Sequence, residues 1–198
     1  MVKRLQKNRS TASARRLLAA AGVDQMIFMT DNTRVPEPEA AVKRLPPGSI
    51  VILRDYEHAE RLALAHKLRR VCRAAGCLFL VAGDSALARR VGADGVHLPE
   101  YMLNDHQASY RGFCMVTAAC HSRAALRQAS ALGVDFALVS PVFTTGSHAD
   151  AVPLGVQGFA RIIAGAQVPV AALGGINHQT AKRLRGLNIA AIAAISAI

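Results

Sequence analysis

Short apolar runs alternate with longer, helix-like stretches along this chain from about residue 25 onward. Most apolar runs are rich in β-branched residues and stop at Gly, Asp, Ser or Pro, a pattern typical of buried strands. They predict strands over residues 25–30, 49–54, 77–82, 95–98, 113–118, 136–140, 168–173 and 189–195. Between them, Ala, Leu and Arg recur with a period near 3.6, which predicts helices near residues 37–45, 57–75, 84–92, 104–110, 122–132, 156–165 and 177–186.

A helix between successive strands makes each connection a crossover between parallel strands. Eight such alternations predict a compact α/β (β/α)8 TIM barrel, a single domain over residues 1–198, with a doubly wound open sheet as the structural alternative. The sequence stops directly after the eighth predicted strand, so the final helix is expected to be missing or supplied from elsewhere. A helix over residues 10–21 that covers the barrel bottom would supply it, as would a partner subunit in a homo-oligomer.

Composition supports one well-packed domain and adds an attraction to anions. The 198 residues are 52% hydrophobic, with a mean hydropathy of +0.23, enough for one substantial core. The net charge of +11 predicts binding of phosphorylated metabolites, nucleic acid or lipid head groups. The basic segment 1–16 is interpreted as a solvated N-terminal extension, so nucleic acid is not the expected partner.

Cysteine spacing and hydropathy bear on the compartment. The four cysteines form no CxxC pair and no zinc-like spacing, so they are interpreted as reduced packing thiols. No apolar run approaches the ~18–20 residues of a membrane span, and the N-terminus lacks an apolar signal core. These features predict a cytoplasmic protein without a membrane partner.

Segment 168–177, VPVAALGGIN, has the features of a phosphate site. Gly174 and Gly175 allow an anion to approach backbone N–H groups, and Asn177 is a candidate N-cap of a helix whose dipole favours negative charge. The terminal run ends at Ser196, whose hydroxyl completes such a site if the two strands are neighbours. In a (β/α)8 barrel, the loops after strands seven and eight form this kind of site.

Further polar residues follow the other predicted strands and would meet at the same rim of a barrel. They are Asp31 and Arg34, Arg54, Asp84, His97 and Glu100, His121, and the polar loop 141–154. His97 lies between two apolar residues, so a structural role is as well supported as a catalytic one. Capping of the following helix competes with a functional role for His121 and for Asp84.

Four segments, VGADGVHL, GVDFALVSPVFTTGSH, PVAALGGIN and the terminal SAI, resemble thiamine-phosphate synthase and its relative TenI, a thiazole tautomerase. The resemblance runs from about residue 28 to the end and implies a (β/α)8 barrel that binds a phosphorylated thiazole. The synthase joins this thiazole to an aminopyrimidine pyrophosphate with Mg²⁺ and releases pyrophosphate. The tautomerase rearranges a thiazole carboxylate phosphate by proton transfer.

Several synthase positions are changed in this chain. Where the family reads QLREK, the sequence ILRDY keeps Arg54 but has Tyr56 for the lysine. Where the family has a TxTK loop, this chain reads Thr145-Gly146-Ser147-His148, so a histidine replaces a second lysine. Thr145 and Ser147 are expected to add hydroxyls to the phosphate site. Where the family reads GVSxH, this chain keeps the histidine as His121 and has Ala119 in place of the serine.

The metal-binding acids of the synthase also fail to carry over completely. One of them falls on Met102, and Asp84 matches the other only with a one-residue gap. Asp84 is therefore the remaining candidate ligand, and Mg²⁺ binding is expected to be weakened. A pyrophosphate leaving group needs cations, whereas tautomerisation needs one well-placed acid or base such as His121.

The expected function is that of thiamine-phosphate synthase, with Arg54, His121 and His148 as the candidate catalytic residues. Two alternatives stay open. One is a TenI-like tautomerase that uses His121, and the other is a barrel without catalysis that binds a phosphorylated metabolite.

Overall fold

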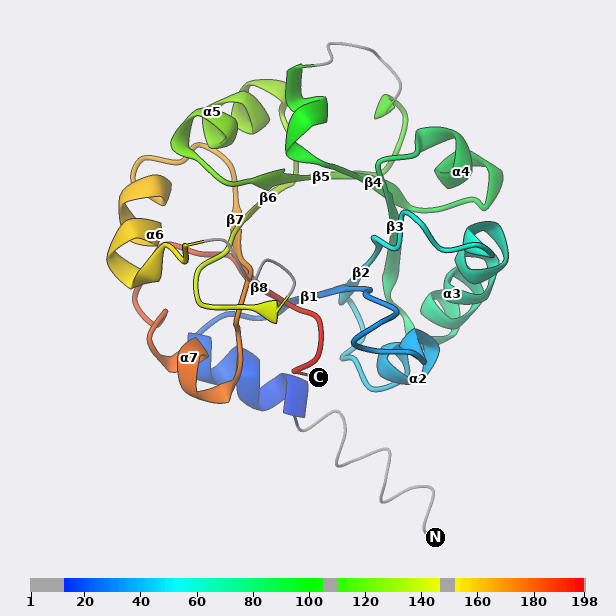
Figure 1. The fold of residues 1–198 in the computed structure, drawn as a ribbon, viewed down its shortest axis with the longest axis horizontal. Helices are drawn as coiled ribbons and strands as arrows, with labels where there is room; N and C mark the ends of the chain where they lie inside the picture. Colours follow the sequence, from blue (N-terminus) through cyan, green and yellow to red (C-terminus); the bar gives the residue numbers. More distant parts are fainter. Residues whose placement is uncertain (1–12, 105–109, 147–151, 198) are drawn as a thin grey trace, which may run out of the picture.

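A computed structural model describes residues 13–104, 110–146 and 152–197 and has eight parallel strands in a closed barrel (Figure 1). The strands follow one another in chain order, and pairing of Gln25 with Ala191 joins the last to the first. Their bounds are β1 (Gln25–Met29), β2 (Ile50–Leu53), β3 (Leu78–Ala82), β4 (Gly95–Leu98), β5 (Met115–Cys120), β6 (Phe136–Val139), β7 (Val170–Ala172) and β8 (Ala191–Ala194). The predicted (β/α)8 barrel is confirmed, and the open-sheet alternative is wrong.

Helices form a ring outside the strands (Figure 1). Their bounds are α2 (Pro38–Val42), α3 (Arg61–Ala75), α4 (Ser85–Arg90), α5 (Arg123–Leu132), α6 (Gly155–Ile163) and α7 (His178–Lys182), with a 3-10 helix η1 (Glu100–Asn104) after β4. In α3, Leu64, Leu68 and Cys72 recur at helical spacing and are buried against the barrel. The helix ends where Gly76 adopts a left-handed conformation, with φ of 69°.

Apolar side chains pack in two layers, one inside the barrel and one between the strands and the helices. Successive strand residues alternate between these layers, as a pleated strand requires. Ile27 and Ile52 belong to the interior, whereas Phe28 and Leu53 belong to the outer layer. The interior packing supports the strand ends from below, so polar residues just beyond them are held at the rim.

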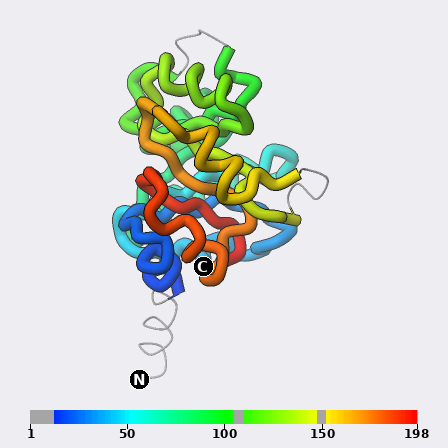
Figure 2. Tube along the Cα trace, turned by 90° about the vertical axis from the view of Figure 1, so that its left-hand side faces the viewer, coloured from blue at the N-terminus to red at the C-terminus, as the bar shows by residue number. Residues whose placement is uncertain are grey.

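The first described helix, residues 13–21, takes the place in the ring that a helix after β8 would occupy. Figures 1 and 2 show it beside the β8 segment, between α7 and α2. Leu17 and Ala21 are buried in the outer layer, and Arg185 donates to the carbonyl oxygen of Ala19 at 3.5 Å. The expected N-terminal helix is thus present from residue 13 onward. No helix within the described ranges is long and apolar enough to cross a membrane.

Candidate active site

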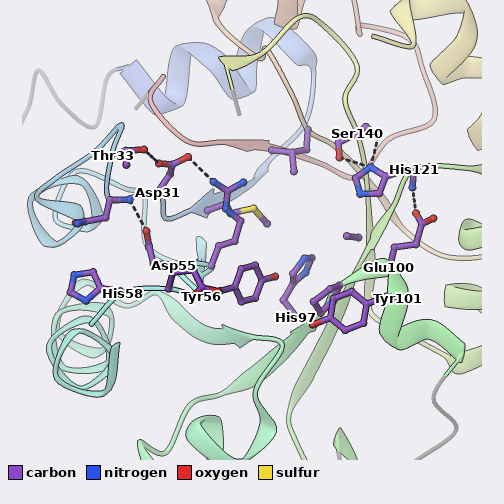
Figure 3. A pocket seen from close by; sticks show the side chains of 17 residues that line it. Asp31, Thr33, Asp55, Tyr56, His58, His97, Glu100, Tyr101, His121 and Ser140 are labelled. Atoms are coloured by element: carbon purple, nitrogen blue, oxygen red, sulfur yellow. Dashed lines mark hydrogen bonds and ion pairs between the residues drawn. The ribbon is translucent and has the colours of Figure 1, made fainter. Parts of the chain in front are cut away.

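A cavity of about 810 Å³ opens at the carboxyl ends of the strands (Figure 3). Its wall is formed chiefly by the residues that follow β1, β2 and β4, together with the ends of β5, β6 and the segment after β7. Arg54, His97 and His121 from the sequence prediction all line it. The volume lies within the range of small-molecule sites.

Asp31 and Arg54 form an ion pair in the cavity wall, with Arg54 Nη2 at 2.6 Å from Asp31 Oδ2. The hydroxyl of Thr33 donates to the other carboxylate oxygen at 2.6 Å, and the backbone N–H of Arg34 lies 3.3 Å from it. Burial raises the pKa of Asp31, but these hydrogen bonds and the charges of Arg54 and Arg34 outweigh burial and leave it below its usual value. Asp31 therefore holds the Arg54 guanidinium in one position as a carboxylate.

Asp55 ties the loops after β1 and β2 together. Its carboxylate accepts hydrogen bonds from the hydroxyl of Thr30 and, at 2.6 Å, from the backbone N–H of Asn32. The same Thr30 hydroxyl accepts from the backbone N–H of Arg54 at 3.0 Å. Arg54 is thus fixed through its backbone as well as through its side chain.

His121 follows β5 and is anchored to the end of β6. Its Nδ1 lies 2.9 Å from the carbonyl oxygen of Ser140, and its backbone N–H donates to the carboxylate of Glu100 in η1 (Figure 3). A carbonyl oxygen only accepts hydrogen bonds, so this contact favours a hydrogen on Nδ1, whereas the Ser140 hydroxyl, 3.3 Å from the same atom, can donate or accept. A neutral ring with the hydrogen on Nδ1 has its lone pair on Nε2, the atom that can then accept a proton.

His97 is a buried, neutral histidine in the cavity floor. It is 2% exposed, and its Nδ1 lies 2.9 Å from the Thr117 hydroxyl of the neighbouring strand β5. Burial lowers the pKa of His97 to about 3, and the nearby charges of Arg54 and His121 act in the same direction. His97 therefore both contacts its neighbouring strand as a buried structural residue and lines the cavity.

The Gly174-Gly175 turn lies next to the end of β8, as the phosphate hypothesis requires. Strands β7 and β8 pair directly, with Ala172 opposite Ile192. Gly174 and Gly175 have φ of 97° and 64°, and a Cβ at Gly175 would lie 2.5 Å from the carbonyl oxygen of Thr144. Only glycine fits this approach of the turn to the loop after β6.

Helix α7 begins with a complete capping box, which confirms Asn177 as its N-cap. The Asn177 side chain accepts from the backbone N–H of Gln179 and Thr180 at 2.9 and 3.0 Å, and the Thr180 hydroxyl accepts from the Asn177 N–H. These amides are therefore already used within the helix. Within the described part of the chain, the amides of Gly174 and Gly175 donate no hydrogen bond. These two amides are therefore the donors available to an anion at this turn.

Ser196 lies beyond β8 and contacts Arg34, one of the polar residues that the sequence places after the first predicted strand. Arg34 Nη2 donates to the Ser196 hydroxyl at 2.8 Å. Both residues border a smaller cavity of about 480 Å³ that reaches Arg44 on the α2 side. The rim around Ser196 is thus more basic than sequence reasoning indicated, because Arg34 approaches it only through folding of the first loop.

Asp84 lies outside the cavity and has two structural partners. Its Oδ1 accepts from the backbone N–H of Leu87 at 2.8 Å and caps α4, and its Oδ2 lies 3.6 Å from Arg61 Nη1. Across residues 13–104, 110–146 and 152–197, no group of three or more His, Cys, Asp or Glu residues could hold a metal ion. Mg²⁺ prefers oxygen ligands, which the thioether of Met102 does not supply, and both carboxylate oxygens of Asp84 already have protein partners.

The loop after β6 carries three further predicted residues. Thr145 is described and follows Thr144, the residue that meets Gly175. Ser147 and His148 lie outside the described residues. The structure thus brings Arg54, His97 and His121 to one cavity and places Gly174, Gly175 and Ser196 along the adjoining edge of the barrel.

Comparisons with known proteins agree with the resemblance seen in the sequence. A family model described as thiamine monophosphate synthase matches residues 26–198. The thiamine-phosphate synthase of Pyrococcus furiosus is 29% identical over 88% of this chain and 86% of its own length. A thiamine-phosphate synthase of Listeria monocytogenes is 32% identical over 71% of this chain and 68% of its own length.

Solved structures show the same fold. A thiamine phosphate pyrophosphorylase from Pyrococcus furiosus matches with a TM-score of 0.68 and 24% identity, over 90% of this chain and 88% of that one. A 3-hexulose-6-phosphate synthase matches with a TM-score of 0.60 and 14% identity, over 87% of this chain and 89% of that one. At these identities, the structural likeness supports the barrel alone.

Proposed function

The chain belongs to the thiamine monophosphate synthase family, and we propose that it joins an aminopyrimidine pyrophosphate to a thiazole phosphate. In this reaction a bond forms between the methylene carbon of the pyrimidine and the thiazole nitrogen. The bond from that carbon to the pyrophosphate oxygen breaks, and the electron pair leaves with pyrophosphate. The observation that carries the proposal is the pairing of β7 with β8, which sets the Gly174-Gly175 turn beside the Ser196 segment. The turn directly follows Leu173, which lines the Arg54 cavity.

The thiazole phosphate is assigned to the edge formed by Gly174, Gly175 and Ser196. The two glycine amides supply N–H donors where no side chain intervenes. The Ser196 oxygen accepts from Arg34, so its own hydrogen can point toward an anion. Arg34 then contributes positive charge at the same edge.

Arg54 is assigned to the pyrophosphate end of the reaction. Negative charge develops on the leaving group, and a fixed guanidinium stabilises that charge without reorganising during the reaction. Asp31 neutralises part of this potential but keeps the guanidinium in place, at 2.6 Å. His121, on the facing wall, serves as a hydrogen-bonding partner for the substrate between these two ends.

Magnesium is not assigned a site in this chain. The family resemblance implies Mg²⁺ beside the pyrophosphate, but Asp84 is used in capping and in an ion pair with Arg61. Met102, at the other acidic position, provides no oxygen ligand. No step of the proposed mechanism is therefore routed through a metal ion.

A pyrophosphate-release assay tests the proposal. The protein is mixed with the aminopyrimidine pyrophosphate and the thiazole phosphate, with Mg²⁺ in the buffer, and free pyrophosphate and the coupled product are measured together. Equal amounts of both are expected. A protein that binds thiazole phosphate in calorimetry but releases no pyrophosphate would rule out the synthase reaction.

A tautomerase is the second candidate, because of the geometry of His121. The contact with the Ser140 carbonyl favours the tautomer in which Nε2 is the basic atom, and this residue lines the cavity. Moving a proton between two positions of a thiazole carboxylate phosphate needs such a group and no pyrophosphate-binding cations. The test measures interconversion of the two tautomers of the thiazole carboxylate phosphate. Loss of this activity in His121→Asn, with the activity kept in Arg54→Gln, would favour this candidate over the synthase.

A further inference from the structure

Two tyrosines stand together at the cavity mouth, on loops that follow different strands. Tyr56 follows β2 and Tyr101 lies in η1 after β4, and both line the cavity (Figure 3). They are 45% and 73% exposed, and Val152 is the one other large apolar residue so exposed in the described part of the chain. Two exposed aromatic rings together at the mouth of a cavity indicate a ligand surface, because contiguous exposed apolar surface marks interaction sites.

Gly83 makes the approach of the two rings possible. A Cβ at this position would lie 3.0 Å from Tyr56 Cε1 and 3.7 Å from the Tyr101 hydroxyl oxygen. Both tyrosines therefore reach the same point above the turn after β3. Burial raises the pKa of the Tyr56 phenol, and the neighbouring Tyr101 raises it further, so Tyr56 is a neutral hydroxyl near neutral pH.

One face of the Tyr56 ring is supported by a fixed cation. The guanidinium carbon of Arg61 lies 5.5 Å from the ring centroid, a cation–π distance. Arg61 is itself held by the carbonyl oxygen of Ala82 at 2.6 Å and by Asp84 at 3.6 Å. The ring is thus positioned before any ligand arrives, which reduces the entropy lost on binding.

The charges around the two rings, where Arg54 and Arg61 are each paired with an aspartate, favour a ligand ring that is electron-poor or protonated. Asp55, Glu57 and Glu100 line the same cavity, whereas Arg54 is paired with Asp31. An aromatic face carries negative potential and attracts a ring with positive character. Carboxylates beside it accept hydrogen bonds from exocyclic amino groups and protonated ring nitrogens.

We propose that Tyr56 and Tyr101 form a stacking platform that binds the planar aminopyrimidine ring of the substrate. The assignment of this ring rests on the proposed function, whereas the platform itself rests on the geometry of the mouth. The synthase motif that the sequence resembles carries a lysine at the position of Tyr56. This chain therefore holds the pyrimidine substrate by its ring, at a place where a lysine would contact an anion.

Tyrosine fluorescence provides a direct readout, because the chain has no tryptophan and three tyrosines, of which two form the platform. The probe is the unphosphorylated hydroxymethyl aminopyrimidine, and inorganic pyrophosphate is the non-aromatic control ligand. A Tyr110→Phe background removes the third emitter. In that background, the pyrimidine is expected to quench the emission, and pyrophosphate is expected to leave it unchanged.

Matched variants separate stacking from folding. Tyr56→Phe and Tyr101→Phe retain a ring and are expected to bind the pyrimidine within about threefold of the parent in calorimetry. Tyr56→Leu and Tyr101→Leu are expected to raise Kd about tenfold each, with unchanged circular dichroism and thermal midpoint. Unchanged affinity in the folded double leucine variant would overturn the platform.

The same variants distinguish this proposal from the proposed function. Ring-dependent pyrimidine binding without pyrophosphate release would keep the platform and reject the synthase reaction. Pyrophosphate release with an unchanged KM for the aminopyrimidine pyrophosphate in the leucine variants would keep the synthase reaction and reject the platform.

Discussion

Asp31 holds Arg54 in the cavity wall through a 2.6 Å ion pair that joins the carboxyl ends of β1 and β2. Hydrogen bonds from the Thr33 hydroxyl and the Arg34 backbone N–H go to the other oxygen of this carboxylate. The ion pair fixes the direction of the Arg54 guanidinium, and the Asp31 carboxylate offsets part of its positive charge. A barrel with a net charge of +11 thus has a main cavity where carboxylates outnumber arginines.

Replacing Arg54 tests whether this guanidinium serves the leaving group. Arg54→Gln is expected to lower kcat/KM for pyrophosphate release about 100-fold, because a charge-stabilising donor is lost. Arg70→Gln, on the exposed face of α3, is the control and is expected to leave kcat/KM unchanged. A change below threefold in Arg54→Gln would remove this residue from the mechanism.

Gly175 is predicted to be far less tolerant of a side chain than a glycine with a similar backbone. Gly165 also has positive φ, at 72°, but a Cβ there meets nothing within 4 Å. Gly165→Ala is expected to cost about 1–2 kcal/mol from the left-handed conformation. Gly175→Ala is expected to cost roughly 2 kcal/mol more, because its Cβ meets the Thr144 carbonyl. Urea unfolding measures both, and equal losses would contradict the close approach.

Ser196 is predicted to contribute to phosphate binding. Ser196→Ala removes the hydroxyl that contacts Arg34 and is expected to raise KM for the thiazole phosphate about tenfold, with little change in kcat. Ser130→Ala, on α5, provides the control. If Ser196→Ala lowers kcat and leaves KM unchanged, the hydroxyl acts elsewhere in the reaction.

His97 is predicted to make stability depend on pH. Its pKa is lowered to about 3 by burial, whereas an unfolded histidine titrates near 6.5. Between these values the unfolded chain binds a proton that the folded chain excludes, so stability falls as the pH falls. The loss from pH 8 to pH 4 is on the order of 3 kcal/mol.

Denaturation at the two pH values, compared between variants, checks this effect. His97→Gln is expected to lose most of the extra pH dependence, whereas His66→Gln, on the exposed face of α3, is expected to keep it. Parallel losses of stability in the wild type and in His97→Gln would show that the histidine is protonated in the fold.

The barrel could be predicted because its signal is local and repeated. Each buried strand is an apolar run followed by a turn residue, and the eight runs lie close to the eight observed strands. The fifth strand shows the limit of this signal. Residues 113–118 are predicted, but β5 runs from Met115 to Cys120, because Ala119 and Cys120 pair with β6.

The site could be predicted only in outline. Position after a strand was enough to find Arg54 and His121 in the cavity wall. The pairing of β7 with β8 confirms that the two segments of the predicted phosphate site are neighbours. Partners that are distant in sequence could not be found in this way. Arg34 meets Ser196 across 162 residues, and Arg61 supports Tyr56 from a helix that gave no local signal of function.

The central claim is that the cavity and the edge beside it form one substrate site, with the phosphate at the Gly174-Gly175 turn. A crystal structure with thiazole phosphate bound tests this claim most directly. The phosphate oxygens are expected to accept hydrogen bonds from the amides of Gly174 and Gly175 and from the Ser196 hydroxyl, with the thiazole ring directed into the Arg54 cavity. A phosphate bound at Arg54, with the glycine turn left in contact with solvent, would contradict the account.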